Sequence, residues 1–591
     1  MMPALGAFPL FLRRAVIGVL AAGLFLFAWL YRFNDPSGSF AGLTDDHFFY
    51  LVRGWQILFG DLPVRDFVDH GAPLYYYVAA AVQLLMGRGT LSELVFSVTV
   101  LAACASATFW LASRGSGSIA AGLVGAAFHI LLDPRFYNYP KILVYVVAIP
   151  LLWRFAEKPT AALRFWLALV TVVGFLFRHD HGAFVAVAMA VQLLLMERTR
   201  WLEKLKHAVL YGAIVCALLA PYLLFVQLNG GVRSYFEQAM AWADRDRDRA
   251  PVVWPGLFDN PDGVSDATKQ SPNPATRGLA VVRDNITAWT YYAEIALPFA
   301  ALALLSLSST AFRPGWPQAR AKIGMVAVLG LVLDAGFLRS PLGARLADPS
   351  VPLAILVAWM LVALVRLFFA KGDLRPSLRG SAMPVRIAGA VIAVPLLFVF
   401  AAGMTKDFYR RLDKSGLTDR FGKGFERASN ITKQLREDWS LESWLTRPSR
   451  PELYELAFYV NACTAPTDRV LVQAYMPQVL ALARRAFAGG HADLRPGFFA
   501  TTGAQELTIA RLRRQSVPVV LLEAGDSLKN FREGFPLVTA YLDEHYRVAG
   551  TKEFDGRFGT TLLVRRDREP AGTYAPLGWP CYGAGVVRSS S

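Results

Sequence analysis

The sequence predicts a polytopic α-helical membrane protein with a smaller α/β domain in its C-terminal part. The 591 residues are 54% hydrophobic and their mean hydropathy is +0.36, which is more apolar than an ordinary soluble protein. Apolar runs recur along residues 1–403 at lengths close to those that a bilayer requires of a helix. Beyond residue 450, strand and helix patterns alternate instead, which predicts the α/β domain.

We expect about eleven membrane spans. The first follows Arg13 and Arg14, and we see no small-residue cleavage site after it, so we interpret it as a retained span rather than a signal peptide. The apolar segment 73–86 is shorter than the ~17–25 residues that a spanning helix needs. The predicted spans are 15–31, 91–112, 118–132, 142–155, 161–177, 183–196, 208–227, 289–307, 323–338, 352–369 and 386–403.

The distribution of lysine and arginine decides the predicted topology. If 73–86 is a re-entrant or interfacial helix, the basic short loops all fall on one side of the membrane. Because such loops face the cytoplasm, the N-terminus is predicted inside and the C-terminus outside. The outer face then receives the first outer loop 32–90, the long loop 228–288 and everything after 403. The expected location is a bacterial-type inner membrane.

The net charge of +16 is explained by the basic cytoplasmic loops and by attraction to anionic membrane lipids. We therefore expect membrane lipids as partners and no nucleic acid. Three regions follow from the composition: a transmembrane catalytic domain at 1–403, an amphipathic linker at 404–450 and an extracytoplasmic α/β domain at 451–591.

The outer domain also holds two of the four cysteines, Cys463 and Cys581, whereas Cys104 and Cys216 fall in predicted spans. A Cys463–Cys581 disulfide is left open, because it requires an oxidising compartment. The elements predicted for the domain are helix Pro451–Cys463, strand Arg469–Gln473, helix Pro477–Phe487, helix Ala504–Gln515, strand Pro518–Glu523, helix Pro536–His545, strand Arg547–Phe554, a turn at Asp555–Gly559 and strand Thr560–Arg565.

An acidic pair, Asp45 and Asp46, follows the first span close to the outer membrane surface. Carboxylates near the end of a transmembrane helix are costly unless they have a function. One of two adjacent, mutually repelling carboxylates is suited to act as a general base. The alternative is a helix N-cap, because Thr44 and the pair precede a helical pattern. The two interpretations are compatible.

Cationic residues at the outer ends of spans are candidate ligands for a phosphate. Lys141 either pairs with a phosphate at the headgroup level or extends to the interface as a snorkelling lysine. Arg339 and Arg345 suit bidentate phosphate binding, with a solvated loop as the alternative. Asp133 is a further candidate, although turn formation alone would explain it.

The run Arg178-His179-Asp180-His181 is the densest ionisable cluster at a span boundary. The two histidines and Asp180 could bind a metal, but no fourth ligand is evident, so we predict no metal site. An anion-binding patch formed by Arg178 and His181 is favoured, and an interfacial anchor is the remaining alternative.

Three further runs lie in the first outer loop: Arg53-Gly54-Trp55, Gly60-Asp61-Leu62-Pro63 and Gly71-Ala72-Pro73-Leu74-Tyr75-Tyr76. Together with the acidic pair and the helical layout, they resemble the GT-C superfamily of integral-membrane glycosyltransferases, especially its mannosyl- and aminoarabinosyltransferase branches. The resemblance implies that Asp45 is the catalytic base and that the donor is a polyprenyl-phosphate sugar. It also implies juxtamembrane helices in the first outer loop and an outward α/β domain.

The sequence departs from that family at two positions. Some relatives have an acid at the start of the fourth span, where this chain has Lys141. We therefore favour a metal-independent mechanism without a cofactor, in which a cation stabilises the leaving phosphate, and a divalent cation is left open. Some relatives also have a lysine where this chain has Asp69-His70-Gly71, so His70 is a candidate substitute.

The expected function is transfer of the sugar to a cell-envelope glycan, lipid or protein acceptor. A transporter or flippase of a lipid-linked sugar is the alternative, and it would use the same arginines. Against it stand the absence of an internal repeat and the few charges within spans. A non-catalytic scaffold would have little reason to keep an acidic pair at the membrane surface.

Overall fold

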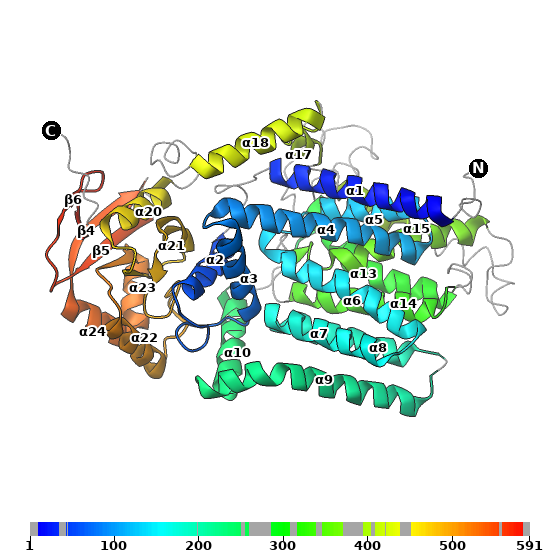
Figure 1. Ribbon diagram of the computed structural model, residues 1–591, viewed down its shortest axis with the longest axis horizontal. Coiled ribbons are helices and arrows are strands. Elements are labelled where there is room, and N and C mark those ends of the chain that lie inside the picture. The colour runs from blue at the N-terminus through cyan, green and yellow to red at the C-terminus, as the bar shows by residue number, and fades with distance from the viewer. Residues whose placement is uncertain are drawn as a thin grey trace. The chain divides into compact units, whose positions relative to one another are not determined.

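The computed structural model of the protein is largely helical (Figure 1). Its contacts divide the chain into two compact units. Unit 1 comprises Met1–Asp35, Ser97–Pro221 and Arg249–Ala428, and unit 2 comprises Pro36–Phe96, Tyr222–Asp248 and Ser429–Ser591. The domain boundaries predicted at 403 and 450 stay predictions. The structure describes residues 10–34, 43, 45–197, 199–249, 254–258, 285–307, 316–338, 345–369, 394–403, 408–419, 421–437, 451–554 and 558–582.

Unit 1 is a bundle of long apolar helices that lie side by side (Figure 1). Small residues allow the helices to approach closely. A Cβ atom on Gly125 of α5, for example, would lie only 2.8 Å from the backbone oxygen of Ala354 in α15. The described elements are α1 (Leu10–Asn34), α4 (Thr90–Ser116, which begins in unit 2), α5 (Ile119–Leu131), η2 (Phe136–Asn138), α6 (Tyr139–Glu157), α7 (Ala161–Phe177), α8 (His179–Leu195), α9 (Trp201–Leu228, which ends in unit 2), α13 (Ile286–Leu307), α14 (Ala319–Asp334), η3 (Ala335–Leu338), α15 (Ser350–Phe369), α17 (Phe408–Lys414) and α18 (Phe421–Glu437, which ends in unit 2).

Every predicted span coincides with a helix wherever the structure describes it. For the last span the described part is 394–403, which is helical, and 386–393 lies outside the described residues. The count of eleven spans and the topology stay predictions. Judged by length and composition alone, fewer than eleven of the described helices qualify as membrane spans. Among the described residues, five helices are long and apolar enough to cross a membrane, at Arg14–Asn34, Thr90–Ser116, Phe136–Glu157, Trp201–Leu228 and Ile286–Ser306.

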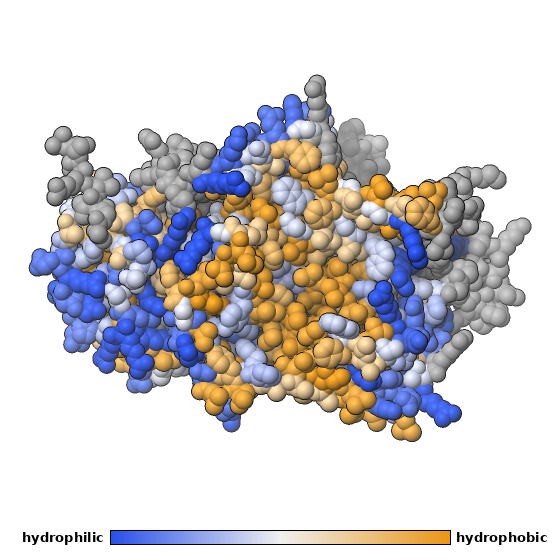
Figure 2. All heavy atoms as spheres, viewed as in Figure 1, coloured by the Kyte–Doolittle hydropathy of each residue, from blue (hydrophilic) through white to orange (hydrophobic). Residues whose placement is uncertain are grey.

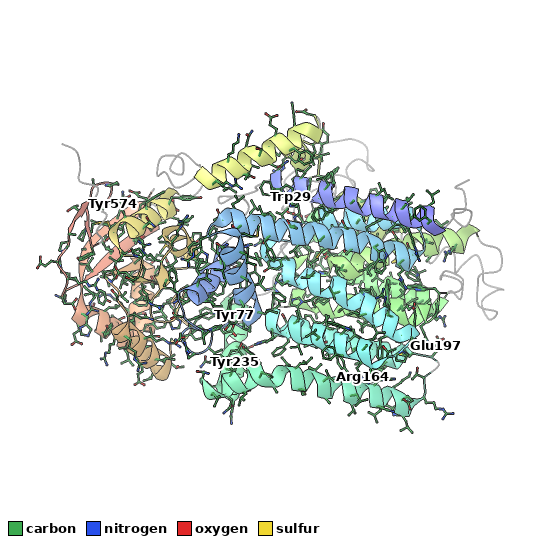
Figure 3. The ribbon with its side chains drawn as sticks, viewed as in Figure 1. Trp29, Tyr77, Arg164, Glu197, Tyr235 and Tyr574 are labelled. Carbon is green, nitrogen blue, oxygen red and sulfur yellow. A yellow bond between two sulfur atoms is a disulfide. The ribbon has the colours of Figure 1, made fainter. Side chains whose placement is uncertain are left out.

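The surface of unit 1 agrees with a lipid environment. Figure 2 shows hydrophobic residues gathered over its helices, and large exposed apolar side chains include Trp166, Leu194 and Val209. Arg164 and Glu197 lie at the same end of the α7–α8 hairpin (Figure 3). That is the end which the charge pattern assigns to the cytoplasm.

Unit 2 contains a five-stranded mixed sheet with the order β2-β1-β3-β5-β4. β1 pairs in parallel with β2 and β3, and β5 pairs antiparallel with β3 and β4. A buried core that includes Leu471, Val520 and Phe535 joins the sheet to its helices. The described elements are α20 (Pro451–Cys463), β1 (Arg469–Val472), α21 (Pro477–Ala483), β2 (Ala486–Phe487), α22 (Thr502–Arg514), β3 (Val519–Glu523), α23 (Asp526–Gly534), α24 (Pro536–His545), β4 (Tyr546–Phe554), β5 (Phe558–Arg565), β6 (Gly572–Tyr574) and β7 (Trp579–Cys581).

The partly parallel sheet predicted from the sequence is confirmed, with one correction. The helix predicted for Pro477–Phe487 ends at Ala483, and Ala486–Phe487 form β2 instead. The physical reason is Arg484, whose φ of 52° lies in the left-handed region and cannot continue a helix. The sequence also did not predict α23, β6 or β7, and most of the predicted turn Asp555–Gly559 lies outside the described residues. A disulfide joins Cys463 of α20 to Cys581 of β7.

The remaining elements of unit 2 are α2 (Asp45–Leu58), α3 (Pro73–Met86) and α10 (Val232–Arg249). α3 has the bounds of the predicted interfacial segment, although nothing tests its position at the membrane. It packs on α2 at Gly54, where an added Cβ atom would lie 2.8 Å from the Cβ atom of Ala79. α10 lies within the long loop predicted at 228–288, so part of the described portion of that loop is helical.

Candidate functional site

The structure brings several predicted phosphate-binding residues together at one end of unit 1. They lie at the start of α6, between α7 and α8, and just before α15. We call this group the bundle-end cluster; its members are Lys141, Arg178, Asp180, His181 and Asp348. Sequence reasoning identified the first four of them and missed Asp348.

Lys141 is held by a nearly buried ion pair. Its ammonium nitrogen lies 3.1 and 2.9 Å from the two carboxylate oxygens of Asp348, and the side chains are 11% and 14% exposed. Asn138 donates a further hydrogen bond to Asp348 at 3.2 Å. These contacts fix the ammonium group at the start of α6. Lys141 is therefore an ordered cation with a carboxylate partner, and both interpretations of its role at the membrane stay predictions.

The turn between α7 and α8 supplies the rest of the cluster. Arg178 is extended, with a φ of −172°, and it both ends α7 and precedes α8. Its guanidinium lies 2.8 Å from a carboxylate oxygen of Asp180, whose other oxygen is 3.6 Å from Nε2 of His181. The hydroxyl of Tyr145 contacts Nδ1 of His181. His179, in contrast, stacks on Phe175, with ring centroids 4.3 Å apart.

The cluster is balanced in formal charge, with one lysine and one arginine against two aspartates. His181 interacts electrostatically with all four of these groups. Arg345 lies in the turn that leads to Asp348, whose backbone N–H donates to the Arg345 carbonyl at 3.0 Å. Arg339 lies outside the described residues. Within the described ranges there is no group of three or more side chains with the arrangement of a metal site.

Asp133 forms a structural contact elsewhere in unit 1. It lies 2.9 Å from a guanidinium nitrogen of Arg32 in α1, and it also pairs with Arg411 in α17. Arg32 donates a further hydrogen bond to the backbone oxygen of Pro134. The φ of Asp133 is 53°, a turn conformation that aspartate tolerates. The turn-forming alternative therefore explains Asp133.

Two buried carboxyl groups of unit 1 were missed by sequence reasoning. Glu294 in α13 is 0% exposed and Asp334 at the end of α14 is 5% exposed. Their four carboxyl oxygens have no hydrogen-bond partner among the residues that the structure describes. Glu294 interacts electrostatically with Asp334 and with Asp348 of the cluster. A single acid inside an apolar run was the signal that could have identified each of them.

In unit 2, the acidic pair occupies the first turn of α2. Asp45 is the first residue of the helix, and its side chain lies outside the described residues. Asp46 accepts a 2.7 Å hydrogen bond from the hydroxyl of Tyr475. Burial, and then the Asp46 carboxylate, raise the pKa of Tyr475, so the tyrosine remains a donor. The first turn of a helix stabilises negative charge, so both acids fit this position. The cap formed by Thr44 stays a prediction.

A buried pair at the next residue fixes this end of α2. Nε2 of His47 lies 2.9 Å from a carboxylate oxygen of Glu93 in α4, and both side chains are 0% exposed. Gln83 of α3 contacts the other oxygen of Glu93 at 3.5 Å. These contacts hold the helix that carries Asp45 and Asp46.

His70 is half-buried in unit 2 and faces cations. A guanidinium nitrogen of Arg53 lies 3.2 Å from its Nδ1, and Arg53 also covers the ring of Phe49 at 3.4 Å. Burial, and then Arg53, hold the pKa of His70 well below its usual value. A neutral imidazole that already accepts a hydrogen bond is a poor substitute for a phosphate-binding lysine. That role of His70 stays a prediction without support from its surroundings.

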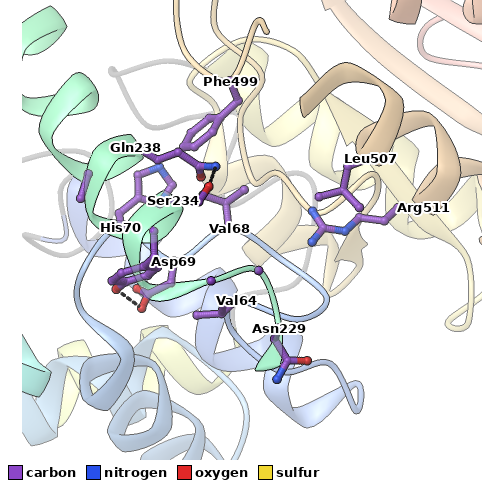
Figure 4. Close-up of a pocket in the computed structure, with 14 residues that line it drawn as sticks. Val64, Val68, Asp69, His70, Asn229, Ser234, Gln238, Phe499, Leu507 and Arg511 are labelled. Carbon is purple, nitrogen blue, oxygen red and sulfur yellow. Dashed lines mark hydrogen bonds between the residues drawn. The ribbon is translucent and has the colours of Figure 1, made fainter. Parts of the chain in front are cut away.

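Asp69 and His70 line a pocket of about 140 Å³ in unit 2 (Figure 4). Asp69 accepts hydrogen bonds from the hydroxyls of Tyr222 and Tyr235 at 3.0 and 2.7 Å. The backbone N–H groups of Gly71 and Ala72 donate to its other oxygen. With four hydrogen bonds accepted, Asp69 is suited to hold the loop rather than to act as a base. Besides Asp69, His70 and Tyr235, the polar side chains that line it are those of Asn229, Ser234 and Gln238, which both donate and accept, and of Arg511, which only donates.

The comparisons with known proteins are sparse. No protein-family model and no curated protein sequence matches this chain. Among solved structures, the crystal structure of ArnT from Cupriavidus metallidurans in the apo state is similar, at 13% sequence identity. The similarity covers 93% of this chain and 98% of that chain, with a TM-score of 0.44. Similarity of this degree establishes neither the family nor the function of this chain.

Proposed function

We propose that the protein is an integral-membrane glycosyltransferase. It transfers a sugar from a polyprenyl-phosphate donor to a glycan, lipid or protein acceptor of the cell envelope, on the outer face of a bacterial-type inner membrane. The observation that carries the proposal is the convergence of Lys141, Arg178 and His181 from separate helices at one end of an apolar bundle. Such a group suits the phosphate of a lipid-borne donor.

Two other observations support the proposal. Membrane-length helices, five of them in the part of the chain that the structure describes, are expected of an enzyme whose donor resides in lipid. The Cys463–Cys581 disulfide agrees with an extracytoplasmic α/β domain, because disulfides persist in oxidising compartments.

In the proposed reaction, the carboxylate of Asp45 removes the proton of an acceptor hydroxyl. The resulting oxygen attacks the anomeric carbon of the donor sugar. The bond between that carbon and the phosphate oxygen breaks, and the bonding electrons leave with the polyprenyl phosphate. A single displacement of this kind inverts the anomeric configuration. Asp46 has a supporting role, and its hydrogen bond from Tyr475 fixes its orientation.

The phosphate is neutralised by Lys141 and Arg178, with His181 donating a hydrogen bond and Arg339 and Arg345 as further candidates. In the structure, Asp348 and Asp180 occupy the two principal cations. We infer that the phosphate replaces these carboxylates when the donor binds. The carboxylates keep the cations ordered until then, so less side-chain entropy is lost on binding.

The proposal is tested by transfer of radiolabelled sugar from extracted polyprenyl-phosphate donors to envelope acceptors by the purified full-length protein. Loss of a general base lowers turnover by roughly 100- to 10,000-fold, so Asp45→Asn should lose nearly all transfer while its melting temperature stays unchanged. Asp526→Asn, at an exposed residue of α23, is the matched control and should retain activity. Full turnover in Asp45→Asn would move the base to Asp46 or to another group.

A transporter or flippase of a lipid-linked sugar is the second candidate function. The buried carboxyl groups of Glu294 and Asp334 favour it, because ionisable groups inside membrane helices often mark transport pathways. Reconstituted vesicles separate the two functions. If the wild type transfers sugar from no donor but moves the lipid between leaflets, and Glu294→Gln slows that movement, the transporter function replaces the transferase.

A further inference from the structure

A second pocket of unit 2, of about 380 Å³, is lined by three arginines. Arg88 lies in the turn between α3 and α4, Arg436 near the end of α18, and Arg484 just after α21. We call it the arginine pocket. Its other lining residues are Met86, Gly87, Gly89, Thr90, Leu91, Ser92, Val95, Thr432, Leu435 and Leu482. None of the three arginines belongs to the catalytic proposal.

The charged residues among the described lining of the arginine pocket are three arginines, with no aspartate or glutamate beside them. Arg88 and Arg484 both line this pocket, and Arg88 lowers the pKa of Arg484 after the larger effect of partial burial. Positive groups held within reach of one another attract an anion, and the guanidinium fork matches the oxygens of a phosphate.

The turn that carries Arg88 is held in place by hydrogen bonds. Gln83 donates to the carbonyl of Gly89 at 3.2 Å and accepts from the Gly89 N–H at 2.8 Å. The hydroxyl of Ser92 donates to the carbonyls of Met86 and Gly87. Gly87 has a φ of 95°, which a residue with a side chain rarely adopts. The first turn of the long helix α4, beginning at Thr90, adds backbone N–H groups that favour an anion.

Apolar groups adjoin the arginines. Leu84 and Leu85 at the end of α3 are 72% and 83% exposed, and α4 is itself long and apolar enough to cross a membrane. Leu91, Val95 and Leu435 line the pocket. A soluble phosphate would use only the arginines, whereas a phospholipid would use the arginines and the apolar surface together. The combination therefore favours a lipid.

We propose that the arginine pocket binds the phosphate headgroup of an anionic membrane lipid, whose acyl chains cover the exposed end of α3. The proposal goes beyond the transferase function and does not depend on it, because binding is measured without turnover. A failed transfer assay therefore leaves it intact, and a failed binding assay leaves the transferase proposal intact.

The test measures binding to the purified full-length protein in detergent. The probes are dioctanoyl phosphatidylglycerol, dioctanoyl phosphatidylcholine and inorganic phosphate. We expect phosphatidylglycerol to bind more tightly than phosphatidylcholine. The variant Arg88→Gln/Arg484→Gln should weaken phosphatidylglycerol binding by at least about tenfold, as expected when one charged contact is lost. The matched control is Arg233→Gln, at an exposed arginine of α10 in the same unit, which should bind like the wild type.

The three probes distinguish the source of the phosphate. If inorganic phosphate binds as tightly as phosphatidylglycerol, and the double variant loses both, the site is upheld and its ligand is soluble. Equal binding of the two lipids, or unchanged phosphatidylglycerol binding by a double variant with the wild-type melting temperature, would overturn the proposal. A variant that melts early is replaced by Arg88→Lys/Arg484→Lys, which should keep part of the affinity because the charge remains.

Discussion

The bundle-end cluster of unit 1 and the arginine pocket of unit 2 arrange positive charge in opposite ways. In the cluster, Lys141 and Arg178 are each paired with a carboxylate, and the Lys141 pair is nearly buried. In the pocket, Arg88 and Arg484 are exposed and near each other, and no described acid lines the pocket. A buried cation requires a fixed partner in the resting protein, whereas solvent screens the charges of exposed cations that lie near one another. We therefore expect the cations of the cluster to depend more on their carboxylates than the arginines of the pocket depend on any one contact.

The largest effect is expected from breaking the buried pair in the cluster. Lys141→Met should lower the free energy of unfolding by about 3–5 kcal/mol, because Asp348 is left as an uncompensated buried carboxylate. Asp348→Leu should destabilise similarly, and the double variant should recover most of the loss. A double-mutant cycle on thermal unfolding in detergent measures the coupling.

The control for this pair is Lys423→Met. Lys423 forms an exposed pair with Asp419 in α18, four residues apart, and its removal should leave the melting temperature unchanged. Equal losses from Lys141→Met and Lys423→Met would show that burial does not distinguish the two pairs, and the contrast between cluster and pocket would fail.

The next effect concerns a buried histidine of unit 2 that faces arginines instead of acids. Burial, and then Arg511 and Arg53, lower the pKa of His491 to about 3. Its unfolded value is near 6.5, so the unfolded state binds more protons between these values and stability falls as the pH drops from about 6.5 toward 3. At pH 5 the loss is about 2 kcal/mol.

Thermal unfolding at pH 7 and pH 5 measures this loss. His491→Gln keeps a group that can contact Thr508, which lies 3.0 Å from Nε2 of the histidine, but it removes the titration. The variant should lose less stability than the wild type on acidification. The same loss in both proteins would assign the pH dependence to other groups.

The smallest effect is expected in the pocket itself. Arg484 is exposed, so in Arg484→Gln without added anion the free energy of unfolding should change by less than about 0.5 kcal/mol. With phosphatidylglycerol present, the wild type should gain more stability than the variant. A clear loss of stability in Arg484→Gln without lipid would indicate a structural arginine.

The sequence predicts the ends of a helix well where a residue that interrupts the apolar run follows it. The segments 161–177 and 73–86 coincide with α7 and α3, because an apolar run ends at a charged residue or glycine in each case. β2 was not predicted, because a strand of two residues is too short to show an alternating pattern of apolar and polar residues. The left-handed conformation of Arg484, which ends the preceding helix, has no signal in the sequence either. The strand pairing itself is long-range, yet β1 and β3 were predictable because both are short, buried aliphatic runs.

The candidate sites are less predictable, because their partners are distant in sequence. Lys141 could be selected as a cation at a helix end, but Asp348 lies 207 residues away and no local pattern connects them. The arginine pocket is assembled from three segments, and each of its arginines alone resembles an ordinary solvated residue. Glu294 and Asp334 differ: each is an acid within an apolar run, so the sequence contained that signal.

The bond between Cys463 and Cys581 closes a covalent ring across a separation of 118 residues. All five strands of the main sheet and the four helices from α21 to α24 lie inside this ring. A protease that cuts any one loop between the two cysteines therefore opens the ring without releasing a fragment. The two pieces would separate on a denaturing gel only after reduction. A domain closed in this way tolerates a single backbone cleavage, because its halves cannot diffuse apart before they reassociate.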